Sequence, residues 1–214
     1  IFDESDLANQ TCIVGLDLAK TRDMTAMVLC FPCGERWRLL PYFFLPEEGV
    51  RRIAVKVPAI MQWVKDGHII VTPGDVTDYN YIEQKFKELS ERFFIDKIVF
   101  DRYNAEHLTQ RVSEALGVER EEFPQTISNF NEPTQDFERL VISHEIEHNG
   151  NPVLSWQIGH TQVKTDMNAN KRPVKPSPDD VRKIDGVVAA IMALAFARKT
   201  EENANWYKPG RLRN

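Results

Sequence analysis

The sequence lacks long apolar runs, internal repeats and low-complexity segments, and it contains few cysteines. No stretch approaches the roughly 20 apolar residues that a membrane span requires, which excludes a membrane-embedded protein. The three cysteines, Cys12, Cys30 and Cys33, form no spaced framework, so we expect a reducing compartment and no disulfides. The start has neither the basic nor the apolar region of a signal peptide, and its first residue is Ile rather than Met, so we expect an excised fragment.

What the sequence does contain is the composition of a soluble globular protein. Its 214 residues are 42% hydrophobic and 28% charged, which suits one domain with a sizeable core. We expect that domain over residues 1–200 and a basic, flexible tail over residues 201–214. The net charge of −5 argues against a surface that binds nucleic acid indiscriminately, so local basic patches would have to carry any such binding.

Apolar patterns predict strands first and an alternation of helices and strands afterwards. Residues 12–16, 25–31 and 37–44 are apolar or alternating runs separated by turn residues, which predicts an antiparallel meander. Helical periodicity follows at residues 50–65, with a kink or break at Pro58, and at residues 79–94, which lead into a buried-type strand at 97–100. The pattern predicts an α/β fold whose mixed central β-sheet joins an antiparallel three-strand meander to parallel strands and is flanked by helices.

Capping and turn residues indicate the remaining elements. Asn104 can cap a helix that Gly117 ends, and Asn-Gly-Asn-Pro at residues 149–152 would stop a helix over residues 134–148. Strands are expected at residues 68–71, 123–128 and 153–158, with a basic loop at 163–178.

The last helix has the clearest start signals of the chain. Ser177 suits the N-cap and Pro178 the first helical position, and acidic residues follow in the first turn. The helix should run to about Arg198, with an apolar stripe formed by Val181, Ile184, Val188 and Ile191.

Three aspartates, Asp17, Asp101 and Asp185, lie at the ends of apolar segments or inside one. Asp17 and Asp101 follow the expected strands at 12–16 and 97–100, and Asp185 lies within the stripe of the last helix. An aspartate at a strand end is often only a turn or cap residue. However, a buried carboxylate without a partner is costly, and three together would repel one another without cations.

These carboxylates would converge if the two strands are neighbours, because side chains that leave strand ends meet at one edge of a sheet. The last helix would then deliver Asp185 from the face of the sheet. Mg²⁺ and Mn²⁺ take such all-oxygen sites, and two ions about 3.5 to 4 Å apart suit in-line displacement at phosphorus.

A basic segment precedes Asp185, and it is either a nucleic-acid-binding segment or a solvated loop. In the first interpretation it holds phosphates beside the metal site, so that binding depends on salt and little on sequence. Lys183, two residues from Asp185, is the best candidate for touching the scissile phosphate or the attacking water. The segment comprises Lys164, Lys171, Arg172, Lys175, Arg182 and Lys183.

Residues 144–148, His-Glu-Ile-Glu-His, fit the H-E-x-x-H pattern of zinc proteases. On a helix, His144 and His148 would bind zinc, Glu145 would act as base, and His160 could be a third ligand. Against this alternative, the expected helix stops directly at residues 149–150, and the spacing to His160 matches no zincin extension.

Four segments together resemble the nuclease domain of tailed-phage terminase large subunits. They are Ile-Val-Gly-Leu-Asp-Leu-Ala at 13–19, Val-Phe-Asp-Arg at 99–102, Asn-Pro-Val-Leu-Ser-Trp at 151–156 and Lys-Ile-Asp-Gly-Val-Val-Ala-Ala-Ile-Met-Ala-Leu at 183–194. The resemblance implies a ribonuclease H-like fold that binds two Mg²⁺ or Mn²⁺ ions and cuts double-stranded concatemeric viral DNA during genome packaging. Asp17, Asp101 and Asp185 match the family's catalytic acidic positions, and Asp23 matches a further acidic position that assists metal binding in some members.

The same resemblance implies three partners: an N-terminal ATPase domain, a small terminase subunit and the portal. It also implies that the protein is located in the host cytoplasm and transiently at the procapsid. No Gly-x-x-x-x-Gly-Lys-Ser/Thr pattern occurs in this chain, so ATP binding by that route is not expected of it.

Two alternatives stay open at this stage. Junction resolvases, transposases and exonucleases use the same fold and acidic cluster, and a domain of this kind could instead serve only as a docking module.

Overall fold

A mixed β-sheet runs through the centre of the computed structural model, which describes residues 2–19, 23–177 and 180–206, the side chains of 104 and 201–206 excepted. Strands β1 (Thr11–Asp17), β2 (Thr25–Cys33) and β3 (Arg36–Pro46) form an antiparallel meander. Strands β4 (Ile69–Thr72), β5 (Phe94–Phe100) and β6 (Glu119–Glu122) extend it in parallel pairings, in the order β4-β3-β2-β1-β5-β6. The short strand β7 (Ile146–Glu147) pairs with β3. The predicted meander and parallel extension are therefore confirmed.

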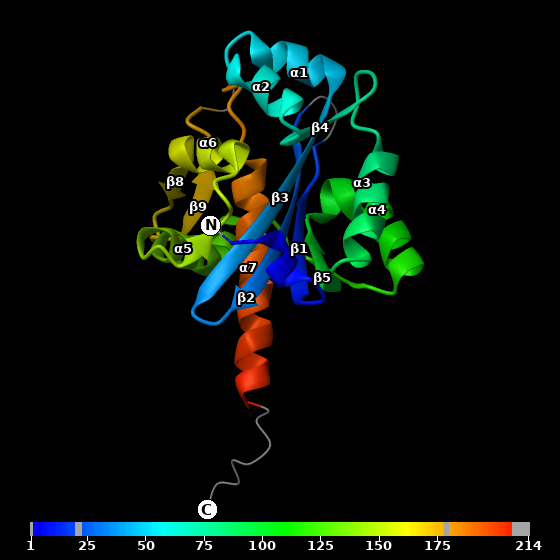
Figure 1. Cartoon of the computed structure of the whole chain (residues 1–214). Helices are drawn as coiled ribbons and strands as arrows, with labels where there is room; N and C mark the ends of the chain where they lie inside the picture. The colour runs from blue at the N-terminus through cyan, green and yellow to red at the C-terminus, as the bar shows by residue number, and fades with distance from the viewer. Residues whose placement is uncertain (1, 20–22, 178–179, 207–214) are drawn as a thin grey trace, which may run out of the picture.

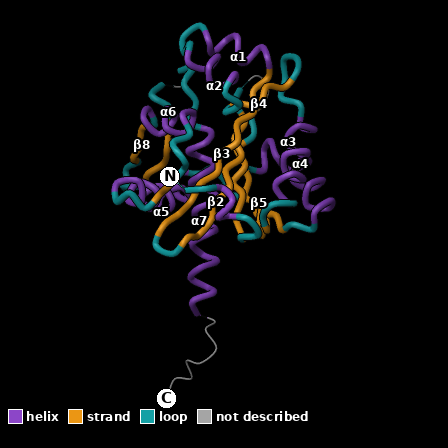
Figure 2. Tube along the Cα trace, viewed as in Figure 1, coloured by secondary structure: helices purple, strands orange, loops and turns teal. Residues whose placement is uncertain are grey.

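Helices cover both faces of the sheet, as the tube view shows (Figure 2). Helices α3 (Tyr79–Ser90) and α4 (Arg102–Leu116) pack on one face. The other face carries α5 (Ile127–Ile142), α6 (Pro152–His160) and α7 (Asp185–Trp206), and the hairpin of β8 (Gln162–Thr165) and β9 (Lys171–Val174) packs on α5. Helices α1 (Glu47–Ala54) and α2 (Ala59–Lys65) lie at one end of the sheet (Figure 1), and a 3₁₀ turn, η1 (Glu4–Leu7), precedes β1. In the described part of the chain, no helix is long and apolar enough to cross a membrane.

Strand β1 is buried on both faces, as expected for a central strand. Ile13 belongs to the apolar cluster on the α7 side, whereas Val14 and Leu16 belong to the cluster on the α3 and α4 side. Gly15 faces α7, and a Cβ at this position would lie 2.0 Å from the carbonyl oxygen of Ala189. The missing side chain therefore lets the backbone of α7 lie directly on β1.

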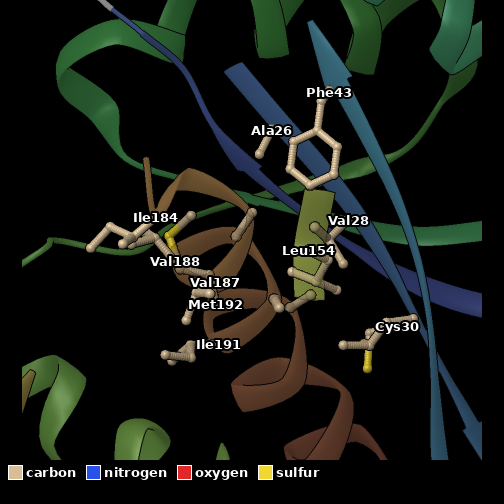
Figure 3. Close-up of a cluster of buried hydrophobic side chains, with 14 of the residues drawn as sticks. Ala26, Val28, Cys30, Phe43, Leu154, Ile184, Val187, Val188, Ile191 and Met192 are labelled. Carbon is tan, nitrogen blue, oxygen red and sulfur yellow. The ribbon is translucent and has the colours of Figure 1, made fainter. Parts of the chain in front are cut away.

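Helix α7 is apolar on all sides over its first half, because it is enclosed by the sheet, α5 and α6. Every residue from 187 to 194 is buried, and Figure 3 shows Val187, Val188, Ile191 and Met192 within the apolar cluster they share with Val28. The second half of α7 extends beyond the sheet (Figure 1). The helix ends at Trp206 rather than near Arg198; residues 207–214 lie outside the described residues, and the division into a domain and a tail stays a prediction.

Several expected boundaries are wrong. The helix over 50–65 is split at Pro58 into α1 and α2, as foreseen, but the strand expected at 123–128 is instead β6 at 119–122 followed by α5 from residue 127. The N-cap position of α4 is Asp101 rather than Asn104, and α5 ends at residue 142 instead of 148. The expected basic loop contains the β8–β9 hairpin.

The region around residues 151–160 is the largest error, because the edge strand expected there is helix α6. Asn151 is its N-cap, whose side-chain oxygen accepts hydrogen bonds from the backbone N–H groups of Val153 and Leu154, and Pro152 is its first residue. The Asn-Pro pair thus begins a helix instead of stopping one.

The last helix also begins later than expected, at Asp185 rather than after Ser177. Pro178 and Asp179 lie outside the described residues, and residues 180–184 are not helical. Asp180 accepts hydrogen bonds from the backbone and the guanidinium of Arg182, which favours a local turn over a first helical turn.

Candidate metal centre

Asp17 and Asp101 lie at the same edge of the sheet, at the carboxyl ends of two neighbouring parallel strands. In the β1–β5 register Leu16 pairs with Phe100, so each aspartate is the next residue after a paired position. Asp185 is the first residue of α7, which packs across β1 and β2. The structure thus brings the three predicted aspartates to one end of the sheet, as the strand ends suggested.

The charges of these three residues interact. Burial is the largest cause that raises the pKa of Asp17 above its ordinary value, and the negative charges of Asp185 and Asp101 raise it further. Gln125 acts in the opposite direction, because its Nε2 donates a hydrogen bond to Asp17 Oδ1 at 3.1 Å. Two carboxylates that cannot both ionise easily are the arrangement that a cation would relieve.

Burial also raises the pKa of Asp185, although the positive charges of Lys183 and Lys175 oppose it. Its Oδ2 atom is buried and has no hydrogen-bond partner within residues 2–19, 23–177 and 180–206. A buried carboxylate oxygen without a partner is costly, so this atom needs a proton or a cation.

The donor set fits hard divalent cations such as Mg²⁺ and Mn²⁺, which prefer carboxylate oxygens. The repulsion between Asp17 and Asp185 and the unpartnered oxygen of Asp185 are the observations that support this fit. Among the residues that the structure describes, no group of three or more His, Cys, Asp or Glu side chains is close enough together to hold a metal ion. The aspartates therefore share one edge and one electrostatic environment without enclosing an ion by themselves.

Asp23, the further predicted metal ligand, is held by two cationic side chains. Its Oδ1 lies 2.7 Å from Lys183 Nζ and 2.5 Å from an Arg52 guanidinium nitrogen. Burial alone would raise the pKa of Asp23, but the hydrogen bonds from Lys183 and Arg52 outweigh it and the pKa is lowered. Asp23 is therefore ionised and already paired in this structure.

The predicted basic residues lie in different environments. Lys183 is buried with its side chain only 5% exposed, and it contacts Asp23 rather than solvent. Lys175 is half-buried, and its charge lowers the pKa of both Asp17 and Asp185, which places it beside the carboxylates.

The β8–β9 hairpin carries three other members of the basic segment, and Arg182 lies between the hairpin and α7. Lys164 is exposed and stands opposite the half-buried Arg172 in the strand register. Lys171 pairs with Glu138 of α5 at 3.3 Å, and Arg182 pairs with Asp180. Lys164, Arg172 and Lys175 are therefore better placed than Lys171 to contact a phosphate backbone.

The H-E-x-x-H segment does not have the geometry of a zinc protease. Helix α5 ends at residue 142, His144 has a positive φ of 58°, and residues 146–147 form β7. The two histidines therefore do not share a helical face. His160 belongs to α6, where its ring contacts the backbone of Lys183.

Residues that the sequence did not single out contact the site through long-range bonds. Gln125 lies in the connection between β6 and α5, Arg52 in α1 and Gln157 in α6, and each contacts the aspartates or the residues beside them. No local pattern marks them, because each of these bonds joins residues at least 29 positions apart.

A mixed sheet with this strand order, helices on both faces and acidic residues at the ends of β1 and β5 defines a ribonuclease H-like fold. The family model described as "Terminase large subunit, endonuclease domain" matches residues 1–201. The chain belongs to this family of terminase endonuclease domains, as the sequence resemblance implied.

The chain is also similar to individual curated proteins. Protein YmfN of Escherichia coli (strain K12) is 28% identical over 207 residues, covering 90% of this chain and 44% of the relative. The large terminase subunit of Enterobacteria phage HK97 is 26% identical over 187 residues, covering 86% and 36%. The chain thus spans less than half the length of the curated relatives it matches.

Solved structures show the same fold. The crystal structure of the HK97 large terminase superposes with a TM-score of 0.77 at 24% identity, covering 92% of this chain and 43% of that one. The large terminase nuclease from thermophilic phage G20c with bound magnesium has a TM-score of 0.54 at 10% identity, covering 86% and 80%.

Proposed function

We propose that this domain is a metal-dependent endonuclease that cuts double-stranded concatemeric viral DNA during genome packaging by two-metal-ion hydrolysis. The observation that carries the proposal is the pair of carboxylates, Asp17 and Asp185. Burial and the charge of Asp185 raise the pKa of Asp17, and an oxygen of Asp185 lacks a hydrogen-bond partner among the described residues. Membership of the terminase endonuclease family supports the reaction class.

Asp17, Asp101 and Asp185 would hold two Mg²⁺ or Mn²⁺ ions. When bound, the ions would activate a water molecule and stabilise the leaving oxygen of the phosphodiester. A G20c relative of the same fold was solved with bound magnesium and another time with bound cobalt, which supports a divalent cation. Asp23 would be a fourth, weaker ligand, and it would have to share its carboxylate with Lys183 and Arg52.

DNA would bind along the basic residues that precede α7. Lys164, Arg172 and Lys175 would contact phosphates, and Lys171 would contribute once it is released from Glu138. Contacts of this kind carry no base information, so binding should weaken steeply with salt and depend little on sequence. Lys183 would act mainly through the carboxylates, because it lies buried against Asp23.

The partners of the domain would lie outside this chain. An N-terminal ATPase domain, a small terminase subunit and the portal would complete a packaging motor in the host cytoplasm, with transient contact to the procapsid. The matched region makes up only 44% and 36% of the two curated relatives, so a longer protein of their kind would have room for such an ATPase domain.

A plasmid cleavage assay tests the proposal. Supercoiled plasmid is incubated with the purified chain and Mn²⁺ or Mg²⁺, and the assay is repeated with Asp17→Asn, Asp101→Asn and Asp185→Asn. We expect nicking and linearisation that a chelator abolishes and that each substitution reduces by at least about 100-fold. Asp96→Asn is the matched control, because Asp96 is an exposed aspartate at the opposite end of β5.

Full activity in all three variants would refute the assignment of the metal ligands. Cleavage restricted to branched DNA would instead favour a junction resolvase with the same fold. Calorimetric titration with Mn²⁺ adds a second measurement, since the three variants should lose affinity even where residual cleavage is hard to quantify.

A further inference from the structure

Helix α7 begins at Asp185, directly after a residue that cannot act as a side-chain cap. The residue before it is Ile184, whose apolar side chain cannot accept a hydrogen bond from the first N–H groups of the helix. Gln157 of α6 replaces the missing cap, because its Oε1 accepts a hydrogen bond from the backbone N–H of Gly186 at 2.7 Å. Since that N–H can only donate, the orientation of the Gln157 amide is fixed.

Gln157 is fully buried and also contacts the connection between β1 and β2. Its Nε2 lies 3.2 Å from the sulfur of Met24, which is the residue after Asp23. At Gly186 a Cβ would lie 2.9 Å from Gln157 Oε1 and 2.7 Å from the ring of Phe43. Glycine therefore allows the buried amide to approach the start of α7.

His160, one turn further along α6, holds the other side of Asp185. Its Nε2 lies 2.9 Å from the carbonyl oxygen of Lys183, and Nε2 must donate because a carbonyl oxygen can only accept. The ring stacks edge-on against Trp156 at 4.6 Å between centroids, and Trp156 packs against Trp63 of α2 at 5.3 Å. These contacts limit the rotation of the imidazole.

We propose that Gln157 and His160 are positioning residues that fix residues 183–186, and thereby aim the Asp185 carboxylate at the cation site. The inference deepens the proposed nuclease function and rests on it. A neutral amide suits this place, since an acidic cap would add a further negative charge beside carboxylates that already repel one another. The two side chains hold the backbone on either side of the proposed metal ligand, through Gly186 and Lys183. Loss of residues that orient a metal ligand typically costs about 10–100-fold in metal affinity or activity.

The test compares substitutions that keep packing with one that keeps the hydrogen bond. Gln157→Met preserves length but loses the acceptor for Gly186, and His160→Phe preserves the ring but loses the donor to Lys183. His160→Gln can still present an amide N–H in the place of Nε2. Ser155→Ala on the same helix is the control, because Ser155 is exposed and its hydroxyl donates only to the Asn151 carbonyl.

Mn²⁺ affinity is measured by calorimetry and plasmid cleavage is measured in parallel, with circular dichroism to establish folding. We expect a loss of about 10-fold or more in Mn²⁺ affinity for Gln157→Met and His160→Phe, with His160→Gln and Ser155→Ala close to the parent. If Gln157→Met does not fold, the His160 pair decides, because Phe and Gln separate ring packing from hydrogen bonding.

Unchanged Mn²⁺ affinity in folded Gln157→Met and His160→Phe would overturn the positioning role, as would equal losses in His160→Phe and His160→Gln. The proposed nuclease function fails separately, if the parent binds Mn²⁺ but leaves DNA intact. In that case the affinities still decide whether Gln157 and His160 position Asp185. A parent that binds no Mn²⁺ would overturn both.

Discussion

Replacing Gly15 by alanine should push α7 away from β1 and move Asp185 relative to Asp17. The added Cβ would lie 2.0 Å from the Ala189 carbonyl oxygen and 3.1 Å from the Ala193 nitrogen, both of them backbone atoms. Restoring an ordinary contact of 3.4 Å requires a shift of about 1.4 Å, and no side-chain rotation can provide it.

The cost of such overpacking is typically about 1–3 kcal/mol. For a chain of this size, each kcal/mol lowers the melting temperature by roughly 2–4 °C, so we expect a decrease of about 2–12 °C. Cleavage should fall further than stability suggests, because a misplacement of about 1 Å in a catalytic arrangement can cost roughly 100-fold in rate.

Thermal unfolding by circular dichroism and plasmid cleavage at a temperature where both proteins are folded provide the two measurements. Gly159→Ala is the matched control, since a Cβ on this residue of α6 meets no atom within 4 Å. It should leave stability unchanged or raise it by up to about 1 kcal/mol. A Gly15→Ala protein that melts and cleaves like the parent would refute the direct packing of α7 on β1.

Three further predictions concern charge. Without metal at neutral pH, Asp17→Asn should raise the melting temperature. The pKa of Asp17 is higher in the folded than in the unfolded chain, so stability falls as pH rises from the ordinary aspartate pKa towards the raised one, and most of that loss is present at pH 7; a melting curve with chelator that shows no gain would contradict this. Lys183→Met removes a cation that lowers the pKa of Asp185. Because Mn²⁺ binds the ionised carboxylate, the pH at which Mn²⁺ binding is half-maximal should rise in calorimetric titrations; an unchanged pH would show that Lys183 does not control the ionisation of Asp185. Glu147→Gln should cost at most about 1 kcal/mol at pH 7, since Arg36 and Arg38 lower the pKa of Glu147. The difference in melting temperature from the parent should shrink as pH falls below the ordinary glutamate pKa of about 4.3; a difference independent of pH would exclude the ion pairs as its cause.

The central sheet and two of its aspartates could be predicted because their signals are local. Alternating and apolar runs mark β1, β2, β3 and β5, and Asp17 and Asp101 directly follow or end such runs. The parallel pairing of β1 with β5 then places both carboxylates at one edge. Nothing beyond strand ends and sheet geometry was needed for this part of the site.

The start of α6 was misjudged because Asn and Pro are signals of both helix starts and helix stops. At residues 149–152 the positive φ values of Asn149 and Gly150 do mark a turn, but Asn151 and Pro152 already belong to the next helix. The apolar residues that follow are compatible with a strand or a helix over so short a run. Packing against α7 settles the choice, and that information is not local.

The start of α7 was misjudged for a different reason, since its cap comes from another helix. Ser177 and the acidic residues after Pro178 look like a complete N-terminal signal, yet Asp180 bonds to Arg182. The N–H of Gly186 is instead satisfied by Gln157, which lies 29 residues away in the sequence. The pairing of Asp23 with Lys183 and Arg52 could not be predicted for the same reason, because these partners also lie far from Asp23 in the sequence.

The all-round apolar surface of α7 has a consequence for the site. An amphipathic helix takes its rotation about its own axis from its apolar stripe, but a helix buried on every side has no such stripe to specify it. Directional contacts must then fix the rotation. They are the Gln157 bond at the first turn of α7, the His160 bond just before the helix and the close approach to Gly15 where α7 crosses β1. Because Asp185 is the first residue of this helix, the contacts that set the rotation of α7 also set the direction of the Asp185 carboxylate.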